Sequence, residues 1–284
     1  MILIADGGST KVDWIALDKD SKKELFRITS QGLNPVVVKE PELINRLYEI
    51  TEIYQSRLKI TEIYFYGAGC GSEQSVKKLN TVLISVFKKA KITIKEDILA
   101  AAYSCAITKP SIICILGTGS NSCYYDGTTI TKINPSLGYS IMDEASGNYF
   151  GKRLLRDYYY NKMPIKLATQ FKKKFNLDID VVKSNLYNKP NPNMYLATFS
   201  KFMLDYQDEY YIKRLIKKGF KKYLKYYVLP YKKNTGTPIY FVGSIAYYFK
   251  NILINVAKKN NLFITDIIQR PIDNLVKFHQ INKI

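Results

Sequence analysis

The chain has 284 residues, of which 46% are hydrophobic and 24% are charged, a balance typical of a folded globular protein. This length is sufficient for two modest domains, each with its own hydrophobic core. No apolar run approaches the roughly 20 residues that a membrane-spanning helix needs. The N-terminus reaches Asp6 without a basic segment, which a secretory signal would have. The composition therefore predicts a cytoplasmic protein.

The net charge of +19 raises the question of nucleic-acid binding, because Lys and Arg neutralise phosphates. The lysines are spread along the chain, however, and in the densest stretch, Lys213–Lys233, they alternate with tyrosines. At helical spacing this pattern favours a solvated face with the tyrosines turned inward. A nucleic-acid partner is not expected. The four cysteines form no C-x-x-C pair and His279 is the one histidine, which argues against a zinc site or a histidine-based mechanism.

The predicted elements begin with three strands. The first two, Ile2–Ala5 and Val12–Asp18, flank a glycine-rich turn at Asp6–Lys11, and a third at Glu24–Thr29 completes an antiparallel meander. A helix is expected over Pro41–Arg57, because its leucines and isoleucines recur on one face. The following elements are expected to be a strand (Ile63–Tyr66), a helix (Glu73–Lys89), a short strand (Ile92–Ile94) and a helix that opens near Asp97.

The pattern then restarts. The apolar strand Ser111–Leu116 runs into a second glycine turn, Gly117–Asn121, and the strand Ser122–Asp126 follows, which makes a weak internal repeat. The region from Lys152 to Tyr227 is predicted to be mostly helical. The last expected elements are a strand (Pro238–Val242) that ends in Gly243-Ser244, a helix to about Asn260, a strand (Leu262–Ile264) and a helix (Ile272–Ile281). This alternation predicts an α/β protein of two domains with a cleft between them.

Both glycine turns carry the groups that bind phosphate. Glycine has no Cβ, so backbone N–H groups can approach a phosphate closely. In the first turn the glycines are followed by two hydroxyls and a cation: Gly7, Gly8, Ser9, Thr10 and Lys11. Asp6 is placed to hold Mg²⁺ through its carboxylate. One such turn also fits an ordinary hairpin, but two turns in equivalent places favour binding of a polyphosphate. Gly243-Ser244 is suited to contact the base and ribose of a nucleotide.

The turns match neither a P-loop nor a Rossmann fingerprint. They resemble motifs of the actin/hexokinase superfamily, most closely the branch with N-acetylglucosamine kinases and BadF/BadG/BcrA/BcrD ATPases. The matching segments are Asp6–Lys11 (first phosphate motif), Gly117–Asn121 (second phosphate motif), Val242–Ser244 (adenosine motif) and Asp143–Gly147 with Tyr149–Gly151 (an Asp-Glu-Gly-Ser-Gly signature). The resemblance implies two actin-like ATPase domains with a ribonuclease H-like fold. These are residues 1–108, on which a helix at 271–284 packs back, and residues 109–270, which include a mostly helical insertion.

The resemblance also implies ATP and Mg²⁺ as cofactors and a small sugar as substrate. Asp97 matches the family's catalytic aspartate, which accepts the proton of the sugar hydroxyl; the alternative is that it caps the following helix. The phosphate and adenosine motifs place the nucleotide on Gly117, Thr118, Gly119, Gly243 and Ser244, in addition to the first turn. The sugar-binding positions map onto Asn34, Thr118, Asn121, Gly138, Tyr139 and Asp143. For Asn34 the alternative is a turn residue before proline, and for Asp143 it is a helix cap.

Two departures bear on the substrate. Ala145 replaces the signature's glycine, and since alanine disfavours positive φ, the loop is expected to take an ordinary conformation or to shift. Tyr139 stands in a stretch that is richer in glycine in the family. The expected reaction is phosphorylation of N-acetylglucosamine at its 6-OH, with N-acetylmuramic acid, glucosamine and a plain hexose left open.

Three other functions share some of these sequence features. A dehydratase or reductase activator of the BadF type holds an iron–sulfur cluster through cysteines in its second half, and no cysteine follows Cys123 here. The hypothesis of a basic nucleic-acid-binding protein is supported only by the charge and the tyrosine content. Asp6 and Asp97, together with both glycine turns, argue against an inactive pseudo-kinase. The family resemblance suggests a dimer.

Overall fold

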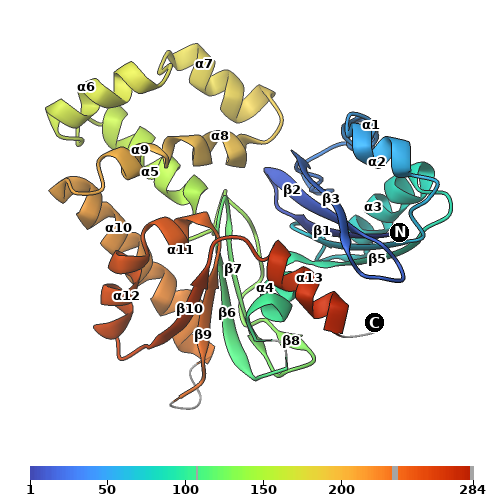
Figure 1. Ribbon diagram of the computed structural model, residues 1–284. Coiled ribbons are helices and arrows are strands. Elements are labelled where there is room, and N and C mark those ends of the chain that lie inside the picture. Colours follow the sequence, from blue (N-terminus) through green and yellow to red (C-terminus); the bar gives the residue numbers. More distant parts are fainter. Residues whose placement is uncertain (107, 232–235, 282–284) are drawn as a thin grey trace. The chain divides into compact units, whose positions relative to one another are not determined.

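The computed structural model describes residues 1–106, 108–231 and 236–281 (Figure 1). The chain divides into two compact units: unit 1 comprises Met1–Ile107 with Pro271–Ile284, and unit 2 comprises Thr108–Arg270. Within the described residues, no helix combines the length and apolar character that crossing a membrane requires.

Unit 1 is built on a five-stranded sheet in the order β3-β2-β1-β4-β5. Its strands are β1 (Ile2–Gly7), β2 (Lys11–Leu17), β3 (Glu24–Gln31), β4 (Glu62–Gly67) and β5 (Lys91–Glu96). β1, β2 and β3 form antiparallel pairs, which confirms the predicted meander, whereas β4 and β5 extend the sheet in parallel. The carboxyl ends of β1, β4 and β5 meet at one edge, where Gly7 aligns with Gly67 and Gly67 with Glu96.

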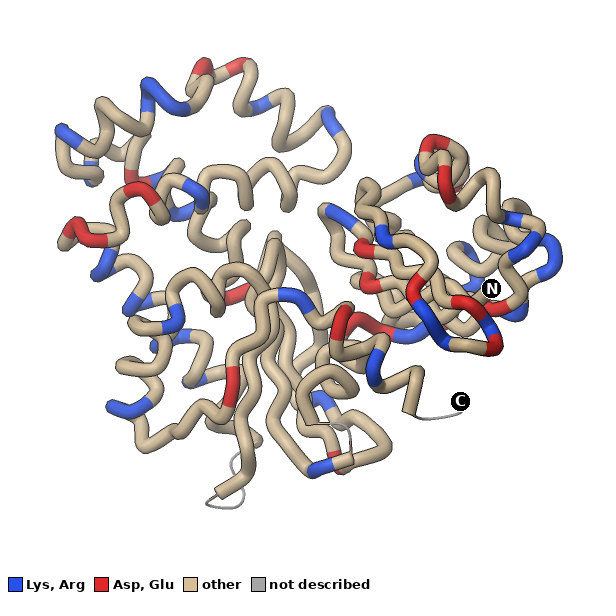
Figure 2. Tube along the Cα trace, viewed as in Figure 1, with Lys and Arg blue, Asp and Glu red and all other residues tan. Residues whose placement is uncertain are grey.

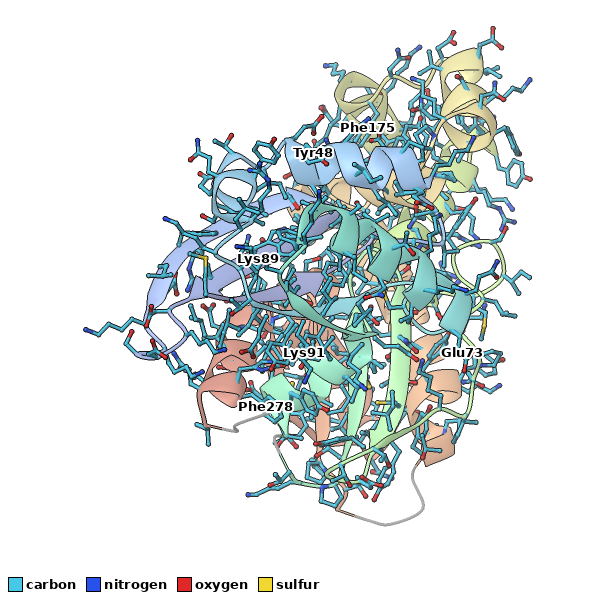
Figure 3. The ribbon with its side chains drawn as sticks, turned by 90° about the vertical axis from the view of Figure 1, so that its right-hand side faces the viewer. Tyr48, Glu73, Lys89, Lys91, Phe175 and Phe278 are labelled. Carbon is cyan, nitrogen blue, oxygen red and sulfur yellow. The ribbon has the colours of Figure 1, made fainter. Side chains whose placement is uncertain are left out.

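Alternate residues of β1 face two helical layers, as the pleat of a strand requires. Leu3 and Ala5 share a core with α1 (Glu40–Tyr48) and α3 (Glu73–Val86), the helices in front of the sheet in Figure 3. Ile2 and Ile4 share a second core with α4 (Asp97–Cys105) and α13 (Ile272–Ile281). A strand buried on both faces reads as a continuous apolar run, which is why β1 was visible in the sequence.

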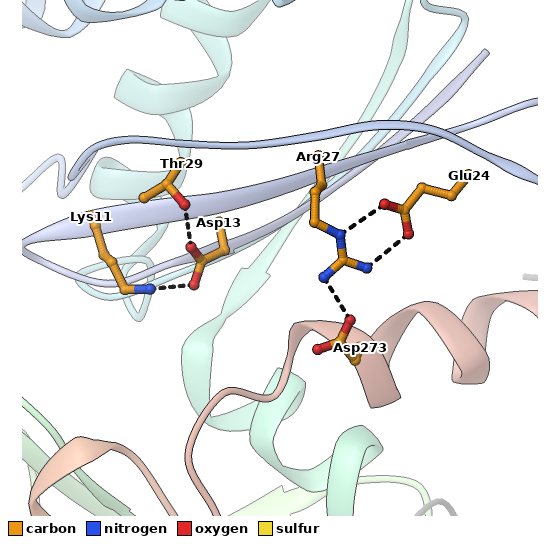
Figure 4. Close-up of polar contacts among 6 residues, drawn as sticks. All are labelled: Lys11, Asp13, Glu24, Arg27, Thr29 and Asp273. Carbon is orange, nitrogen blue, oxygen red and sulfur yellow. Dashed lines mark hydrogen bonds and ion pairs between the residues drawn. The ribbon is translucent and has the colours of Figure 1, made fainter.

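The helix α13 packs against unit 1 although it lies at the other end of the chain. Arg27 of β3 donates to Asp273 over 2.9 Å and also pairs with Glu24 (Figure 4). The Asn274 side chain donates to the carbonyl of Ser104 in α4 over 3.1 Å. These polar contacts add to the apolar packing that holds α13 on unit 1.

The helix predicted over Pro41–Arg57 is wrong in its continuity. The chain forms α1 and then a separate short helix, α2 (Thr51–Ser56). Between them Ile50 has an extended backbone, with φ −87° and ψ 93°, and its side chain is buried in the core. Burial of Ile50 and Ile53 therefore overrides a continuous helix, because the bend directs both side chains inward.

Unit 2 repeats the sheet of unit 1, in the order β10-β9-β6-β7-β8. Its strands are β6 (Ser111–Leu116), β7 (Ser120–Tyr125), β8 (Ile130–Thr131), β9 (Ile239–Val242) and β10 (Ile264–Ile268). β6 takes the place of β1, because it pairs antiparallel with the next strand and parallel with β9. The two apolar strands and glycine turns predicted an internal repeat, and the structure shows that this repeat is one of sheet topology.

The last strand lies further along than the predicted Leu262–Ile264. Leu262 is buried in the core of unit 2, and Asn261 before it has a positive φ of 54° that ends the preceding helix. Pairing with β9 begins only at Ile264. The apolar run at this place therefore anchors a turn, and the strand follows it.

The helices of unit 2 pack on one large core, which includes Phe150, Phe220 and Phe241. The α-helices are α5 (Gly147–Tyr159), α6 (Ile165–Lys174), α7 (Ile179–Lys183), α8 (Pro192–Phe199), α9 (Phe202–Asp205), α10 (Tyr210–Tyr223), α11 (Ser244–Tyr248) and α12 (Lys250–Lys258). Two π-helical segments (Ser184–Asn188 and Leu224–Val228) and a 3₁₀ turn (Leu229–Tyr231) complete the set.

The lysine- and tyrosine-rich stretch has the structure that its pattern predicted. Tyr223, Tyr227 and Tyr231 are buried and Lys221, Lys222 and Lys225 are exposed, although Tyr226 is exposed as well. Figure 2 shows Lys and Arg distributed over both units. Lys232 and Lys233, the end of the predicted stretch, lie outside the described residues.

Candidate active site

The first glycine turn connects β1 to β2 as a tight hairpin. The N–H of Gly8 donates to the carbonyl of Lys11 over 2.8 Å, and the N–H of Gly32 donates to the carbonyl of Thr10 over 3.0 Å. A Cβ at Gly32 would lie 2.3 Å from the Ser9 carbonyl oxygen, so a side chain there would displace the turn. The chain segment after β3 therefore fixes the shape of the turn from one side.

Asn34 is buried beside this turn, and its side chain is used internally. Its Nδ2 donates to the Ser9 hydroxyl over 2.9 Å, and its Oδ1 accepts the N–H of Val36 over 2.9 Å. A Cβ on Gly69 would lie 2.1 Å from Oδ1. This is the geometry of a turn residue that also holds the phosphate turn, and a sugar contact for Asn34 stays a prediction.

Three aspartates of unit 1 interact at the carboxyl edge of the sheet. Asp6 on β1 is directly opposite Asp13 on β2, and Asp97 follows Glu96, which aligns through Gly67 with the end of β1. Burial, the nearby charge of Asp97 and that of Asp13 raise the pKa of Asp6 to about 7, against the opposing effect of Lys11. The edge thus concentrates negative charge where the resemblance places a metal and a base.

Asp13 is a site residue that the sequence reading missed. It is 7% exposed, and its carboxylate accepts from the Thr29 hydroxyl over 2.7 Å and from the Lys11 ammonium over 2.5 Å (Figure 4). The signal was available, because a tight hairpin that pairs Gly7 with Val12 must also pair the residues next to them. Lys11, predicted to contact phosphate, is positioned here by Asp13.

Asp97 is not the cap of α4. The N-cap position belongs to Glu96, with an extended backbone and no side-chain capping bond, and Asp97 is the first helical residue. The capping alternative for Asp97 is therefore wrong. Burial, and then the charges of Asp97 and Glu96, raise the pKa of the Cys70 thiol to about 12.

The acidic edge fits Mg²⁺. Within residues 1–106, 108–231 and 236–281, no three His, Cys, Asp or Glu side chains are grouped as a metal cage. Mg²⁺ does not need such a cage, because it keeps several waters and is commonly held by one or two carboxylates with substrate phosphates. A cation beside Asp6 would also offset the charges of Asp97 and Asp13, which add to the effect of burial in raising the pKa of Asp6.

The second glycine turn is held by the loop before α5. The N–H of Gly117 donates to the Gly119 carbonyl over 3.0 Å. The carbonyls of Gly117 and Thr118 accept the N–H groups of Gly147 and Asn148, over 2.8 and 3.0 Å. The space where a Cβ of Gly117 would project is open to 4 Å. At Gly117 the backbone is therefore open to a ligand, as a phosphate clamp requires.

The adenosine motif lies against this turn. Gly243 has a positive φ of 117°, and a Cβ there would lie 2.5 Å from the Leu116 carbonyl oxygen and 3.2 Å from the Gly117 nitrogen. Its N–H donates to the Ile268 carbonyl over 2.9 Å. Ser244, the first residue of α11, is exposed. The structure thus brings the second phosphate motif and the adenosine motif together within unit 2, as a nucleotide requires.

Asp143 is buried under the second turn. Its Oδ1 accepts the N–H of Ser120 over 3.1 Å, and its Oδ2 accepts from the Asn148 side chain over 2.8 Å. Burial raises the pKa of the Asp143 carboxyl group, and these hydrogen bonds oppose the rise. The N-cap of α5 is Ser146, which accepts from Tyr149, so the capping alternative for Asp143 is wrong.

The Asp143 loop does not take an ordinary backbone conformation at Ala145. Ala145 has a φ of 56° and Asp143 a φ of 67°, both in the left-handed region, and Ala145 is fully buried. The loop therefore keeps the conformation that the signature's glycine would allow and accepts a strained alanine.

The other predicted sugar-binding positions lie in the same unit. Asn121 is half-buried, and its carbonyl accepts from the Tyr223 hydroxyl over 2.7 Å. Gly138 has a φ of 74°, and the carbonyl of Tyr139 accepts from the Lys152 side chain over 2.9 Å. The structure thus connects the Gly138-Tyr139 loop to α5, the helix that begins just after Asp143.

Solved structures share this architecture. A candidate N-acetylglucosamine kinase from Porphyromonas gingivalis is 34% identical, with all of both chains covered and a TM-score of 0.90. A second candidate N-acetylglucosamine kinase, from Chromobacterium violaceum, is 13% identical over 98% of both chains, with a TM-score of 0.74. A ROK family glucokinase from Streptomyces griseus, in complex with glucose and AMPPNP, is 10% identical over 99% of both chains, with a TM-score of 0.56. No family model matches the chain, and no curated protein does.

These likenesses define a protein of the actin-like ATPase fold, in the sugar kinase branch, which confirms the predicted fold class. Because the Porphyromonas gingivalis protein is 34% identical over the full length, the chain belongs to its family of N-acetylglucosamine kinase-like sugar kinases.

Proposed function

We propose that this protein uses ATP and Mg²⁺ to phosphorylate N-acetylglucosamine at its 6-OH, with Asp97 as the general base. The observation that carries this proposal is the position of Asp97, one residue beyond β5, at the sheet edge that also carries Asp6 and the first glycine turn. Phosphoryl transfer to a hydroxyl needs a proton acceptor beside a phosphate- and metal-binding site. Asp97 and Asp6 supply these two functions within one unit.

In unit 2 the nucleotide contacts are assigned to Gly117–Gly119 with Gly243, and in unit 1 phosphate contacts are assigned to Gly7–Lys11. The turns Gly7–Lys11 and Gly117–Gly119 follow equivalent strands, and Gly243 contacts the second turn. Asp6 would hold the Mg²⁺, which balances the charge of the phosphates when bound. Of the six sugar-binding candidates, Thr118, Asn121 and Asp143 lie on or under the second turn, Gly138 and Tyr139 in the loop connected to α5, and Asn34 in unit 1.

N-acetylglucosamine is favoured because a candidate kinase for this sugar is 34% identical over the full length. N-acetylmuramic acid and glucosamine remain the alternatives. They are distinguished by turnover on a panel of these three sugars and glucose. 6-Deoxy-N-acetylglucosamine tests the position of transfer, because a sugar without the 6-OH should bind and not turn over.

The decisive experiment is sugar-dependent ATP consumption by Asp97→Asn. Loss of a general base should lower turnover by roughly 10²- to 10⁴-fold while ATP still binds. Asp273→Asn is a matched control, because Asp273 is also in the first turn of a unit 1 helix and is exposed on its surface. Unchanged turnover in Asp97→Asn, or turnover without Mg²⁺, would contradict the assignment.

A further inference from the structure

The second glycine turn depends on one buried carboxylate for its shape. Asp143 accepts the N–H of Ser120, the residue that ends the turn and begins β7. Its Oδ2 lies 3.0 Å from the place where a Cβ of Gly119 would be. The Asp143 side chain therefore contacts two consecutive residues of the turn, and a rotation of this side chain would move the turn.

Asn148, in the first turn of α5, is the side chain that holds this carboxylate in place. It is fully buried, and its Nδ2 donates to Asp143 Oδ2 over 2.8 Å. Its backbone N–H also donates to the Thr118 carbonyl. A carboxylate can only accept hydrogen bonds, so the amide must present its NH₂ group to Asp143. Asn148 thus contacts the turn directly and through Asp143.

This arrangement costs folding stability, which indicates that the NH₂ donor of Asn148 has a function. In the part of the chain that the structure describes, the buried Oδ1 of Asn148 accepts no hydrogen bond. An unpaired buried carbonyl is destabilising. The backbone of Asp143, with its φ of 67°, is also in a region that non-glycine residues rarely adopt. Such features persist where surrounding contacts hold them.

We infer that Asn148 is a positioning residue for the second phosphate turn: its NH₂ group orients the Asp143 carboxylate, which in turn fixes Gly119 and Ser120. The inference rests on the proposed function only in taking the turn's ligand to be ATP. Nothing in the sequence pattern assigned this role, because Asn148 lies outside the signature residues that carry the family resemblance.

The test compares Asn148→Ala with Asn193→Ala. Asn193 is a matched control because it is also a buried asparagine in the first turn of a unit 2 helix, with an unpartnered Oδ1. The readouts are amide hydrogen exchange at Ser120, affinity for a non-hydrolysable ATP analogue with Mg²⁺, and global stability. Asn148→Ala should speed exchange at Ser120 and weaken the analogue by roughly tenfold, as loss of a hydrogen bond to a charged group predicts. Asn193→Ala should change neither.

A second variant, Asn148→Asp, separates orientation from packing. It keeps the shape of the side chain but replaces the donor with a carboxylate that faces Asp143. If the NH₂ group is what positions Asp143, this near-isosteric change should disturb exchange at Ser120 at least as much as alanine does. Ser120 exchange that is unchanged in both Asn148 variants, or equally changed in Asn193→Ala, would overturn the inference. A wild-type protein that binds no ATP analogue would refute the proposed function, and the exchange comparison would still decide the role of Asn148.

Discussion

Ala145 should tolerate replacement by glycine unusually well. A left-handed backbone costs a non-glycine residue roughly 1–2 kcal/mol, and Ala145→Gly would remove this cost. Against this gain, the variant loses a buried methyl group, about 0.8 kcal/mol, and the glycine adds about 0.5–1 kcal/mol of backbone entropy in the unfolded chain. The free energy of unfolding should therefore change by less than about 1 kcal/mol.

The control is Ala257→Gly. Ala257 is fully buried in the same core but lies within the ordinary helix α12. This substitution loses the same methyl group and about 0.8–1.0 kcal/mol of helix propensity, with no strain to relieve. Its expected loss is about 2 kcal/mol, measured by urea unfolding of both variants. Equal losses in the two variants would refute the claim that Ala145 is strained. Because glycine restores the family signature, sugar-dependent turnover should persist in Ala145→Gly.

Three further predictions concern other parts of the site and fold. Gly243→Ala should weaken ATP binding and lower the melting temperature, because its Cβ would lie 2.5 Å from a carbonyl oxygen at a φ of 117°; normal ATP titration would contradict this. Asn34→Ala should raise the KM for ATP, since Ser9 loses its partner, whereas an effect on the sugar KM alone would point to a direct sugar contact. Burial lowers the pKa of His279 to about 4, so below its unfolded value of about 6.5 the unfolded chain takes up a proton that the folded chain refuses. The contribution of His279 to the free energy of unfolding should then fall from pH 6.5 toward pH 4, whereas Asp6, with its pKa raised to about 7, contributes in the opposite direction. The difference in unfolding free energy between wild type and His279→Gln isolates the histidine, and it should shrink as the pH falls from 6.5 toward 4.

Local patterns predicted most of the architecture. The doubly buried strands β1 and β6 are apolar runs that end in glycine turns, so both halves could be placed before any tertiary contact was known. The break at Ile50 could not be predicted, because a continuous apolar face is compatible with one helix or two. Two helices form because Ile50 is buried in a core to which segments distant in the sequence contribute.

The positions of Asp6 and Asp97 could be predicted from the chain, because one stands near the end of an apolar strand and the other directly follows a strand. Their roles as metal ligand and general base remain proposals. Asn148 could not be identified in this way, because its function depends on the side-chain amide reaching back to Asp143 across the start of α5. The family resemblance assigned Asn34 to sugar binding. Its Oδ1 accepts from Val36, as the turn alternative predicted, but its contact with Ser9 joins distant residues and no local pattern could show it.

The two units share one sheet order but differ in the charge at the equivalent hairpin. In the β1–β2 ladder of unit 1, the pair next to the turn-closing pair is Asp6 with Asp13. In the β6–β7 ladder of unit 2, the equivalent pair is Ile115 with Asn121. The turn of unit 2 carries no ionisable side chain, and the Asp143 carboxylate beneath it is buried and accepts two hydrogen bonds. A carboxylate pair suits a cation, and an uncharged glycine turn suits phosphate oxygens, which bind backbone N–H groups. The two hairpins therefore share their geometry but differ in charge, because a carboxylate pair lies beside the glycine turn of unit 1 and an uncharged pair beside that of unit 2.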